Sequence, residues 1–323
     1  MANMEAMLVG HLRATHYLEA ILKKKTWAHG YLFYGPARVG KETFALAFGR
    51  SLVCEKARGV LGGCGRCETC QISDLRLANR FFCLRPGAAA VGDQEKEPKK
   101  TITIGQVREL RRWLFLASEK IRVVLIDWAE ALGGDAANAL LKILEEPSGG
   151  TVFILISASP EYILPTVLSR VAPIRFGLVA DKEMQKIEGA TDEAIFLSRG
   201  RPGILFSILE NRELLAEKKK LQKIAEMAYG GSIADAFLAA KILADDAEDR
   251  EVALGHILAH FRKDFISLEG APLAGAIGRA KLGLRAFAAL QATNVNPRLA
   301  ADVMFLNFRQ PISMLKDKSK ITI

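Results

Sequence analysis

The sequence lacks any apolar run near the roughly 20 residues that a membrane-spanning helix needs. The first 22 residues also lack the continuous apolar stretch of a signal peptide, because residues such as His11, Arg13 and Glu19 interrupt it. The lack of a membrane span and of a signal peptide leads us to expect a cytoplasmic protein without a membrane partner. No internal repeat is visible.

Cysteine is scarce and unevenly placed. Four of the five cysteines fall within 17 residues, in the pattern C-x9-C-x2-C-x2-C formed by Cys54, Cys64, Cys67 and Cys70. In a reducing compartment such crowding argues for a metal rather than for disulfides. Four sulfur ligands suit a tetrahedral, structural Zn²⁺ site, and the alternatives are a redox pair at Cys64 and Cys67 or an iron–sulfur cluster. Cys83 follows two phenylalanines and is expected to be a buried apolar residue.

Charge of one sign does not dominate, although the chain is basic. The net charge is +9, yet 36 acidic residues are spread among 45 basic ones. The only tight basic runs are residues 23–25 and 218–220, for which a solvated helix face is the simpler interpretation. This balance permits a nucleic acid or an acidic partner without requiring one. With 323 residues, half of them hydrophobic, the chain is long enough for two or three domains.

The first half of the chain alternates short β-type runs with helical stretches. Apolar residues spaced by three or four positions predict helices around residues 44–52 and 107–114. Asp135 is a candidate N-cap for a further helix that ends near residue 144. Buried strands are predicted at residues 31–34, 122–126 and 151–156. Apolar strands separated by helices indicate a parallel sheet covered on both faces.

The second half contains no convincing strand after about residue 181 and should be all-helical. Its start signals include Asn296 and Pro297, as N-cap and first helical residue. We expect a small helical lid followed by a separate bundle, and an exposed insertion at residues 86–101. The amphipathic stretches that predict the bundle are 212–227, 233–243, 251–268, 273–292 and 297–315.

Residues 35–42 read G-x-x-x-x-G-K followed by Glu42, between a predicted strand and a predicted helix. This is the start of a phosphate-binding P-loop: Gly35 and Gly40 let the backbone wrap phosphates, and Lys41 would contact the β- and γ-phosphates. A bare glycine-rich turn is the alternative.

The residue after the P-loop lysine is normally a serine or threonine that ligates Mg²⁺, and here it is Glu42. A carboxylate about 4 Å from another negative charge costs roughly 4 kcal/mol at an effective dielectric constant near 20. Nucleotide binding is therefore expected to be weakened, unless Glu42 turns away or coordinates a cation.

The second predicted strand ends in Asp127, as in the metal-binding strand of P-loop ATPases. Active ATPases of the AAA+ type usually place a glutamate next, to orient the attacking water, and here that residue is Trp128. An indole cannot accept a proton. Glu130 would need an unusual turn to replace it. Because hydrolysis needs both the metal and the oriented water, the sequence predicts little or no ATPase activity.

These features together resemble one family, the AAA+ subunits of bacterial DNA polymerase III clamp loaders. The resemblance lies in the cysteine insertion after the P-loop helix, in residues 136–147, and in Leu164-Pro165 followed by Leu168-Ser169-Arg170. It implies an α/β P-loop domain at 1–178 with a zinc module at 54–70, a helical lid at 179–210 and a helical collar for oligomerisation at 211–323.

Within that family the chain resembles the non-hydrolysing stator, or delta-prime, class more than the gamma/tau motor class. Motors carry serine or threonine in place of Glu42, glutamate in place of Trp128 and an arginine near Gly203, and they have a long tail after the bundle. All four departures indicate a stator. The resemblance then implies gamma/tau and delta subunits as partners, with the sliding clamp and primed DNA reached through the complex.

Arg170 is the candidate catalytic residue, acting in trans. Ser169-Arg170-Val171 matches the family's Ser-Arg-Cys motif except at Val171. In the family this arginine reaches the γ-phosphate of ATP in the neighbouring subunit, a task that suits a permanently charged, forked guanidinium. A surface arginine in an ordinary ion pair is the alternative for Arg170. For the whole chain, the rival functions are an active gamma/tau-type motor and a zinc-dependent DNA-binding module.

Overall fold

The computed structural model describes residues 8–56, 59–72, 74–87, 101–116, 120–146, 149–230, 232–243, 275, 277–278, 280–285 and 297–308. The chain divides into two compact units, Met1–Phe206 and Ser207–Ile323. Within the described ranges, no helix is both long and apolar enough to cross a membrane. The domain limits expected at residues 178 and 210 stay predictions, since the one division observed falls between residues 206 and 207.

The first unit is built on a parallel five-stranded sheet with the order β2-β3-β4-β1-β5. The strands are β1 (Gly30–Tyr34), β2 (Phe81–Leu84), β3 (Arg122–Ile126), β4 (Thr151–Ser157) and β5 (Ala172–Arg175). The sequence predicted β1, β3 and β4, which lie in the middle of the sheet and are buried along almost their whole length. It missed β2 and β5, which are edge strands of four residues each.

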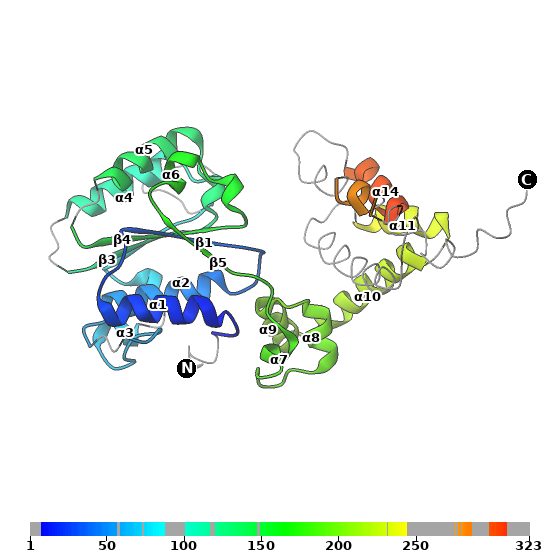
Figure 1. The fold of residues 1–323 in the computed structure, drawn as a ribbon, viewed down its shortest axis with the longest axis horizontal. Helices are drawn as coiled ribbons and strands as arrows, with labels where there is room; N and C mark the ends of the chain where they lie inside the picture. The colour runs from blue at the N-terminus through cyan, green and yellow to red at the C-terminus, as the bar shows by residue number, and fades with distance from the viewer. Residues whose placement is uncertain are drawn as a thin grey trace, which may run out of the picture. The chain divides into compact units, whose positions relative to one another are not determined.

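Helices cover both faces of this sheet (Figure 1). One layer contains α1 (Leu12–Lys24), α2 (Lys41–Val53) and α3 (Glu68–Gln71). The opposite layer contains α4 (Ile104–Phe115), α5 (Gly134–Glu145) and α6 (Pro165–Leu168). Each layer has its own apolar core, because alternate strand residues point to opposite faces. The parallel sheet with helices on both faces confirms the predicted fold class of this part.

Two helix starts show what local signals can and cannot specify. Helix α4 begins with a capping box, in which Thr103 accepts from the backbone of Gln106 and the Gln106 side chain bonds back. The prediction that Asp135 caps α5 is wrong: the N-cap is Gly133, and Asp135 lies in the first turn of the helix. An acidic residue there still favours the helix, because the N-terminus carries positive partial charge.

The remaining described elements are helical. Three short 3-10 turns, η2 (Leu75–Leu77), η3 (Ala129–Ala131) and η4 (Pro160–Tyr162), connect the sheet elements. After the sheet come α7 (Asp181–Met184), α8 (Asp192–Ser198) and α9 (Pro202–Glu210).

In the second unit, α11 (Ile233–Leu243) packs against both α10 (Arg212–Gly230) and α14 (Pro297–Phe308). The described part of this half is thus all-helical, as predicted, and α14 begins at Pro297 as expected. The predicted helix at 251–268, most of 273–292, residues 309–315 and nearly all of the insertion at 86–101 lie outside the described residues.

Candidate functional site

The predicted nucleotide-site residues gather at one edge of the sheet. The P-loop follows β1, Asp127 follows β3, and β4 lies between these two strands. Parallel strands present their carboxyl ends on the same side, so the loops that follow them converge. Residues that are more than 80 positions apart in the sequence therefore share one site.

The P-loop keeps the backbone form that its glycines allow. Gly35 has φ 145° and Gly40 has φ 104°. A Cβ at Gly35 would lie 1.9 Å from the carbonyl oxygen of Phe176, so only glycine fits there. The ammonium of Lys41 is turned onto the loop itself and donates to the carbonyls of Gly35 and Pro36, at 2.5 and 2.7 Å.

Glu42 is paired with a residue that the sequence did not single out. Its Oε1 lies 3.2 Å from Nη1 of Arg76, whose Nε donates to Asp74 Oδ1 at 2.8 Å. Asp74 and, to a smaller extent, Glu42 raise the pKa of Arg76. The charge of Glu42 is thus balanced within the chain by a guanidinium from η2, the segment that follows the cysteine cluster.

Asp127 is a weak acid in this setting. Burial and, to a smaller extent, the nearby charge of Glu42 raise its pKa to about 6, against the opposing effects of the backbone N–H of Trp128 and the charge of Lys41. A cation favours the ionised form of its ligands. The surroundings of Asp127 in the chain alone therefore disfavour the ionised form, which is the form that a metal ligand needs.

Trp128 and Glu130 occupy the turn that follows Asp127. Trp128 adopts φ +55°, a left-handed conformation, and its side chain is 64% exposed. This turn directs Glu130 toward the end of β4, where Glu130 Oε1 accepts a hydrogen bond from the N–H of Ala158 at 3.1 Å. The carboxylate of Glu130 is thus engaged by the backbone of the neighbouring strand's loop.

Two other segments are bonded to the outside of the P-loop. The N–H of Gly203, in α9, donates to the Arg38 carbonyl at 2.9 Å, and a ring nitrogen of His11 lies 2.9 Å from the Val39 carbonyl oxygen. A Cβ at Gly203 would be only 3.0 Å from that Arg38 oxygen. The position where motor subunits would carry an arginine is here a close backbone contact between α9 and the loop.

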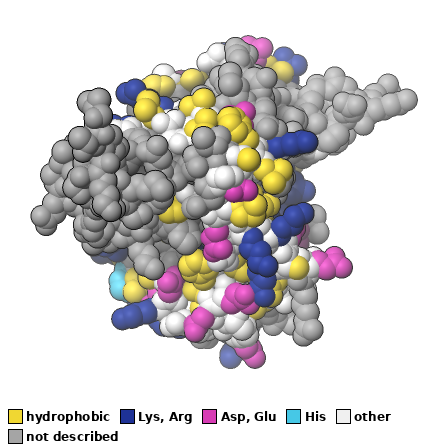
Figure 2. Space-filling view, turned by 90° about the vertical axis from the view of Figure 1, so that its right-hand side faces the viewer, with side chains coloured by type: hydrophobic (Ala, Val, Ile, Leu, Met, Phe, Trp, Pro, Cys, Tyr) yellow, Lys and Arg dark blue, Asp and Glu magenta, His cyan; other side chains and the backbone are white. Residues whose placement is uncertain are grey.

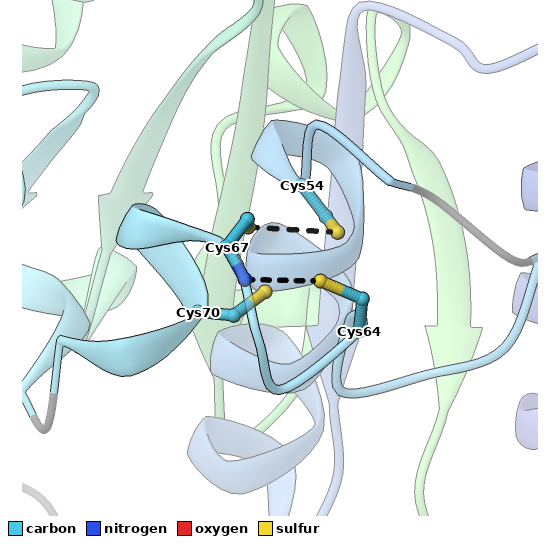
Figure 3. Close-up of side chains that lie close together, drawn as sticks. All are labelled: Cys54, Cys64, Cys67 and Cys70. Carbon is cyan, nitrogen blue, oxygen red and sulfur yellow. Dashed lines mark hydrogen bonds between the residues drawn. The ribbon is translucent and has the colours of Figure 1, made fainter.

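The structure brings the four predicted cysteines together (Figure 3). Their sulfur atoms all lie within 4.8 Å of one another, and those of Cys54 and Cys67 are 3.9 Å apart. A tetrahedron with metal–sulfur bonds of about 2.3 Å has sulfurs about 3.8 Å apart. Cys54 ends α2, Cys64 and Cys67 lie in the loop that follows, and Cys70 is in α3. Four converging thiols of this kind could hold a metal ion.

Backbone hydrogen bonds prepare one of these thiols for the charged form. Hydrogen bonds from the backbone N–H groups of Arg66 and Cys67 lower the pKa of Cys64 to about 6. Burial, in contrast, raises the pKa of Cys54 to about 12. The supporting shell includes Arg50, which the sequence did not reveal and which donates to the carbonyls of Cys70 and Ile72. These contacts fix the cysteine loops against α2.

Arg170 follows the short helix α6 at the surface of the first unit. Its Nη2 lies 2.8 Å from Glu145 Oε1, and its Nη1 donates to the Thr166 carbonyl at 2.8 Å and to Ser169 Oγ at 3.1 Å. About a third of the side chain, 32%, is exposed. Val171, the departure from the family motif, is buried in the core beneath. The structure thus contains an ion pair at Arg170, with the guanidinium still accessible.

The face of the molecule drawn in Figure 2 gives no support to a DNA-binding module. On the face drawn in Figure 2, Lys and Arg side chains lie among Asp and Glu side chains rather than in one basic patch. Dense basic clustering is the electrostatic requirement for binding a phosphate backbone.

The sequence comparisons lead to subunits of DNA polymerase III. Residues 10–179 match a protein family described as DNA polymerase III, delta subunit. The DNA polymerase III subunit delta' of Pseudomonas aeruginosa is 35% identical over 208 residues, or 64% of this chain and 57% of that protein. The corresponding subunit of Escherichia coli is 28% identical over 216 residues, or 63% of this chain and 61% of that protein.

Gamma/tau subunits of DNA polymerase III match the chain as well. The DNA polymerase III subunit gamma/tau of Mycobacterium bovis is 33% identical over 185 residues, or 56% of this chain and 30% of that protein. In all three cases the match spans less than two thirds of the relative's own length.

Proposed function

Because the chain belongs to the family of DNA polymerase III delta subunits, we propose that it is a non-hydrolysing stator subunit of that polymerase's sliding-clamp loader. The resemblance to clamp-loader subunits of the delta-prime class is confirmed by the family match and by the relatives named delta'. In the proposed assembly, which works in the cytoplasm, the chain packs with gamma/tau motor subunits and the delta subunit. Together they load the sliding clamp onto primed DNA.

The observation that carries this proposal is the ion pair between Glu42 and Arg76 at the P-loop. In P-loop ATPases a hydroxyl at the position of Glu42 helps to hold Mg²⁺, and the metal bridges the β- and γ-phosphates. Here the position holds a carboxylate that already has a cationic partner. Trp128 supports the same conclusion, because it takes the place of the water-orienting glutamate. Phosphoryl transfer depends on positioning and electrostatics, so losing both groups removes its basis.

Arg170 is the group through which the chain would act on a neighbour. In this proposal its guanidinium, which is partly exposed in the isolated chain, stabilises the transition-state charge on ATP bound by the adjoining motor subunit. An arginine supplied in trans can accelerate hydrolysis by roughly 10³- to 10⁵-fold. A subunit that hydrolyses nothing can thus control the hydrolysis next to it.

The metal in the proposed protein is a structural Zn²⁺ held by Cys54, Cys64, Cys67 and Cys70. The support is the donor set: four thiols, whose sulfur atoms lie within 4.8 Å of one another, fill a four-coordinate site and leave no position for a substrate. When bound, zinc would supply stability rather than chemistry, by tying the end of α2 to the loop and to α3.

ATP turnover by the purified chain tests the stator against the motor alternative, which the match to gamma/tau keeps open. With Mg·ATP, we expect a rate indistinguishable from that of the Lys41→Ala variant, which defines the background. A Lys41-dependent rate of about 1 s⁻¹ or more, typical of an active ATPase, would instead identify a motor. The same preparation, mixed with gamma/tau and delta subunits and weighed by native mass spectrometry, should enter a defined complex.

A further inference from the structure

Three contacts from two different segments hold the guanidinium of Arg170. Thr166 and Ser169, in and just after α6, hold Nη1, while Glu145 at the end of α5 holds Nη2 at 2.8 Å. We propose that Glu145 is a positioning residue, which fixes the plane of the Arg170 guanidinium so that it is ready to meet a phosphate on a neighbouring subunit. This inference rests on the proposed role of Arg170.

The two ends of the guanidinium are held in different ways. The contacts at Nη1 come from the same short segment as Arg170 itself, so they move with it. The contact at Nη2 joins residues 25 positions apart and comes from a separate element. Because a guanidinium is planar and rigid, holding Nη2 from outside the segment fixes its rotation about the side-chain axis. Of these three partners, only Glu145 supplies this restraint from outside the segment that carries Arg170.

The position of Glu145 is not explained by the stability of its own helix. Glu145 is the last residue of α5, and Glu146 is the C-cap. The C-terminus of a helix carries negative partial charge, which favours cations and disfavours carboxylates. The carboxylate of Glu145 is therefore placed against the preference of its helix, and the Arg170 guanidinium offsets that cost.

Pre-orientation matters for a group that acts by geometry. An exposed arginine has many side-chain conformers, and an unrestrained one must be ordered when it meets its target. Misplacing a catalytic group by about 1 Å can lower a rate by about 100-fold. The expected effect of losing Glu145 is thus on the rate of the step that Arg170 assists, and not on ATP binding by the neighbour.

The test measures DNA-stimulated ATP turnover of the complete loader assembled with Glu145→Ala, Glu145→Gln or Arg170→Ala. We expect Glu145→Ala to lower kcat by at least half as much as Arg170→Ala on a logarithmic scale, with KM for ATP unchanged. Glu145→Gln should restore part of the loss, because its amide oxygen still accepts the hydrogen bond. Glu146→Ala is the matched control: it removes the adjacent carboxylate, and turnover should be unaffected.

The outcomes separate this inference from the proposed function. If Arg170→Ala leaves turnover unchanged, the proposed role of Arg170 fails, and the inference fails with it. If Arg170→Ala lowers turnover while Glu145→Ala lowers only the melting temperature of the chain, the ion pair is merely structural and the inference alone is overturned. A rise in kcat in Glu145→Ala would likewise overturn it, because Glu145 would then restrain Arg170 rather than orient it.

Discussion

Glu42 lies in the first turn of α2, and Arg76 approaches it from a segment 34 residues further along the chain. Both side chains are partly exposed, so the pair adds little to folding stability, about 0.2–1 kcal/mol for pairs of this kind. Its importance is electrostatic. The guanidinium places a positive charge beside Glu42, in the place where a divalent cation would lie in an active site, and shares it with Asp74.

Asp127→Asn should stabilise the fold at neutral pH. The pKa of Asp127 in the folded chain is about 6, because the carboxyl is buried and lies near Glu42. Below about pH 3 the group is protonated in the folded and unfolded chain alike, so wild type and variant should match. As pH rises toward 6 the folded wild type loses stability, by roughly 1–2 kcal/mol after allowing for partial exposure.

Urea unfolding at several pH values between about 3 and 8 measures this difference. The gain in free energy of unfolding for Asp127→Asn should grow through the window between the two pKa values and stay constant above it. Glu188→Gln, at an exposed turn position, is the control for the loss of a surface carboxylate. A difference that is independent of pH would contradict the raised pKa of Asp127.

At the residue scale the sequence was informative about motifs and silent about their partners. The P-loop glycines, Lys41, Asp127 and the cysteines could be named because their spacing is local. Arg76 and Glu145 could not, because each meets its partner only after the sheet has brought distant segments together. No pattern in the sequence marks Arg76, and Glu145 lies in the family-like stretch 136–147 without any sign there of its partner.

At the scale of elements, the cysteine module (residues 54–70) leaves little free space around its sulfur atoms. Gly63 has φ +78°, and a Cβ placed on it would lie 2.7 Å from Cys70 Sγ. Arg50 closes the other side of the same loop, since its guanidinium binds the carbonyls of Cys70 and Ile72. A metal bound by these four thiols would therefore be sensitive to a single added methyl group.

Gly63→Ala should weaken metal retention by at least about tenfold, because the new Cβ displaces the Cys70 sulfur. Gly65→Ala is a matched control: Gly65 has φ +66° but nothing within 4 Å of its Cβ position. It should cost only the left-handed strain of about 1–2 kcal/mol. Both effects are read from zinc content by elemental analysis, with about one zinc per chain expected for the wild type, and from the melting temperature with and without a chelator.

Equal metal loss in Gly63→Ala and Gly65→Ala would show that backbone strain, and not contact with Cys70, governs the site. A wild-type chain that carries no zinc after purification from zinc-containing medium would refute the proposed structural zinc site.

Strands that are buried on both faces could be predicted from the sequence, whereas the edge strands could not. The strands β1, β3 and β4 are apolar throughout because helices cover both of their faces, and such runs stand out. The edge strand β5 alternates exposed and buried residues and contains Pro173, which only an edge strand tolerates. The start of α5 was misassigned because Gly133 caps it without a side chain, whereas Asp135 offered the more usual signal.

At the scale of the whole molecule, the α/β unit and the helical unit were both foreseeable from the change in periodicity near residue 181. The position of the division was not, because α9 is a continuous helix that contains residues of both units. In the proposed function the chemistry likewise belongs to the assembly rather than to the chain. Lys41 bonds the carbonyls of its own loop, whereas Arg170 is placed at an accessible surface.

A rapid-quench measurement of ATP hydrolysis in the reconstituted loader on primed DNA tests this central claim most directly. Loaders carrying Arg170→Ala should form normally and lose the part of the burst that comes from the adjoining motor site, where hydrolysis slows by roughly 10³-fold or more. Loaders carrying Lys41→Ala in this chain should keep the full burst. The opposite pattern, an intact burst with Arg170→Ala and a reduced one with Lys41→Ala, would mean that this chain hydrolyses ATP itself.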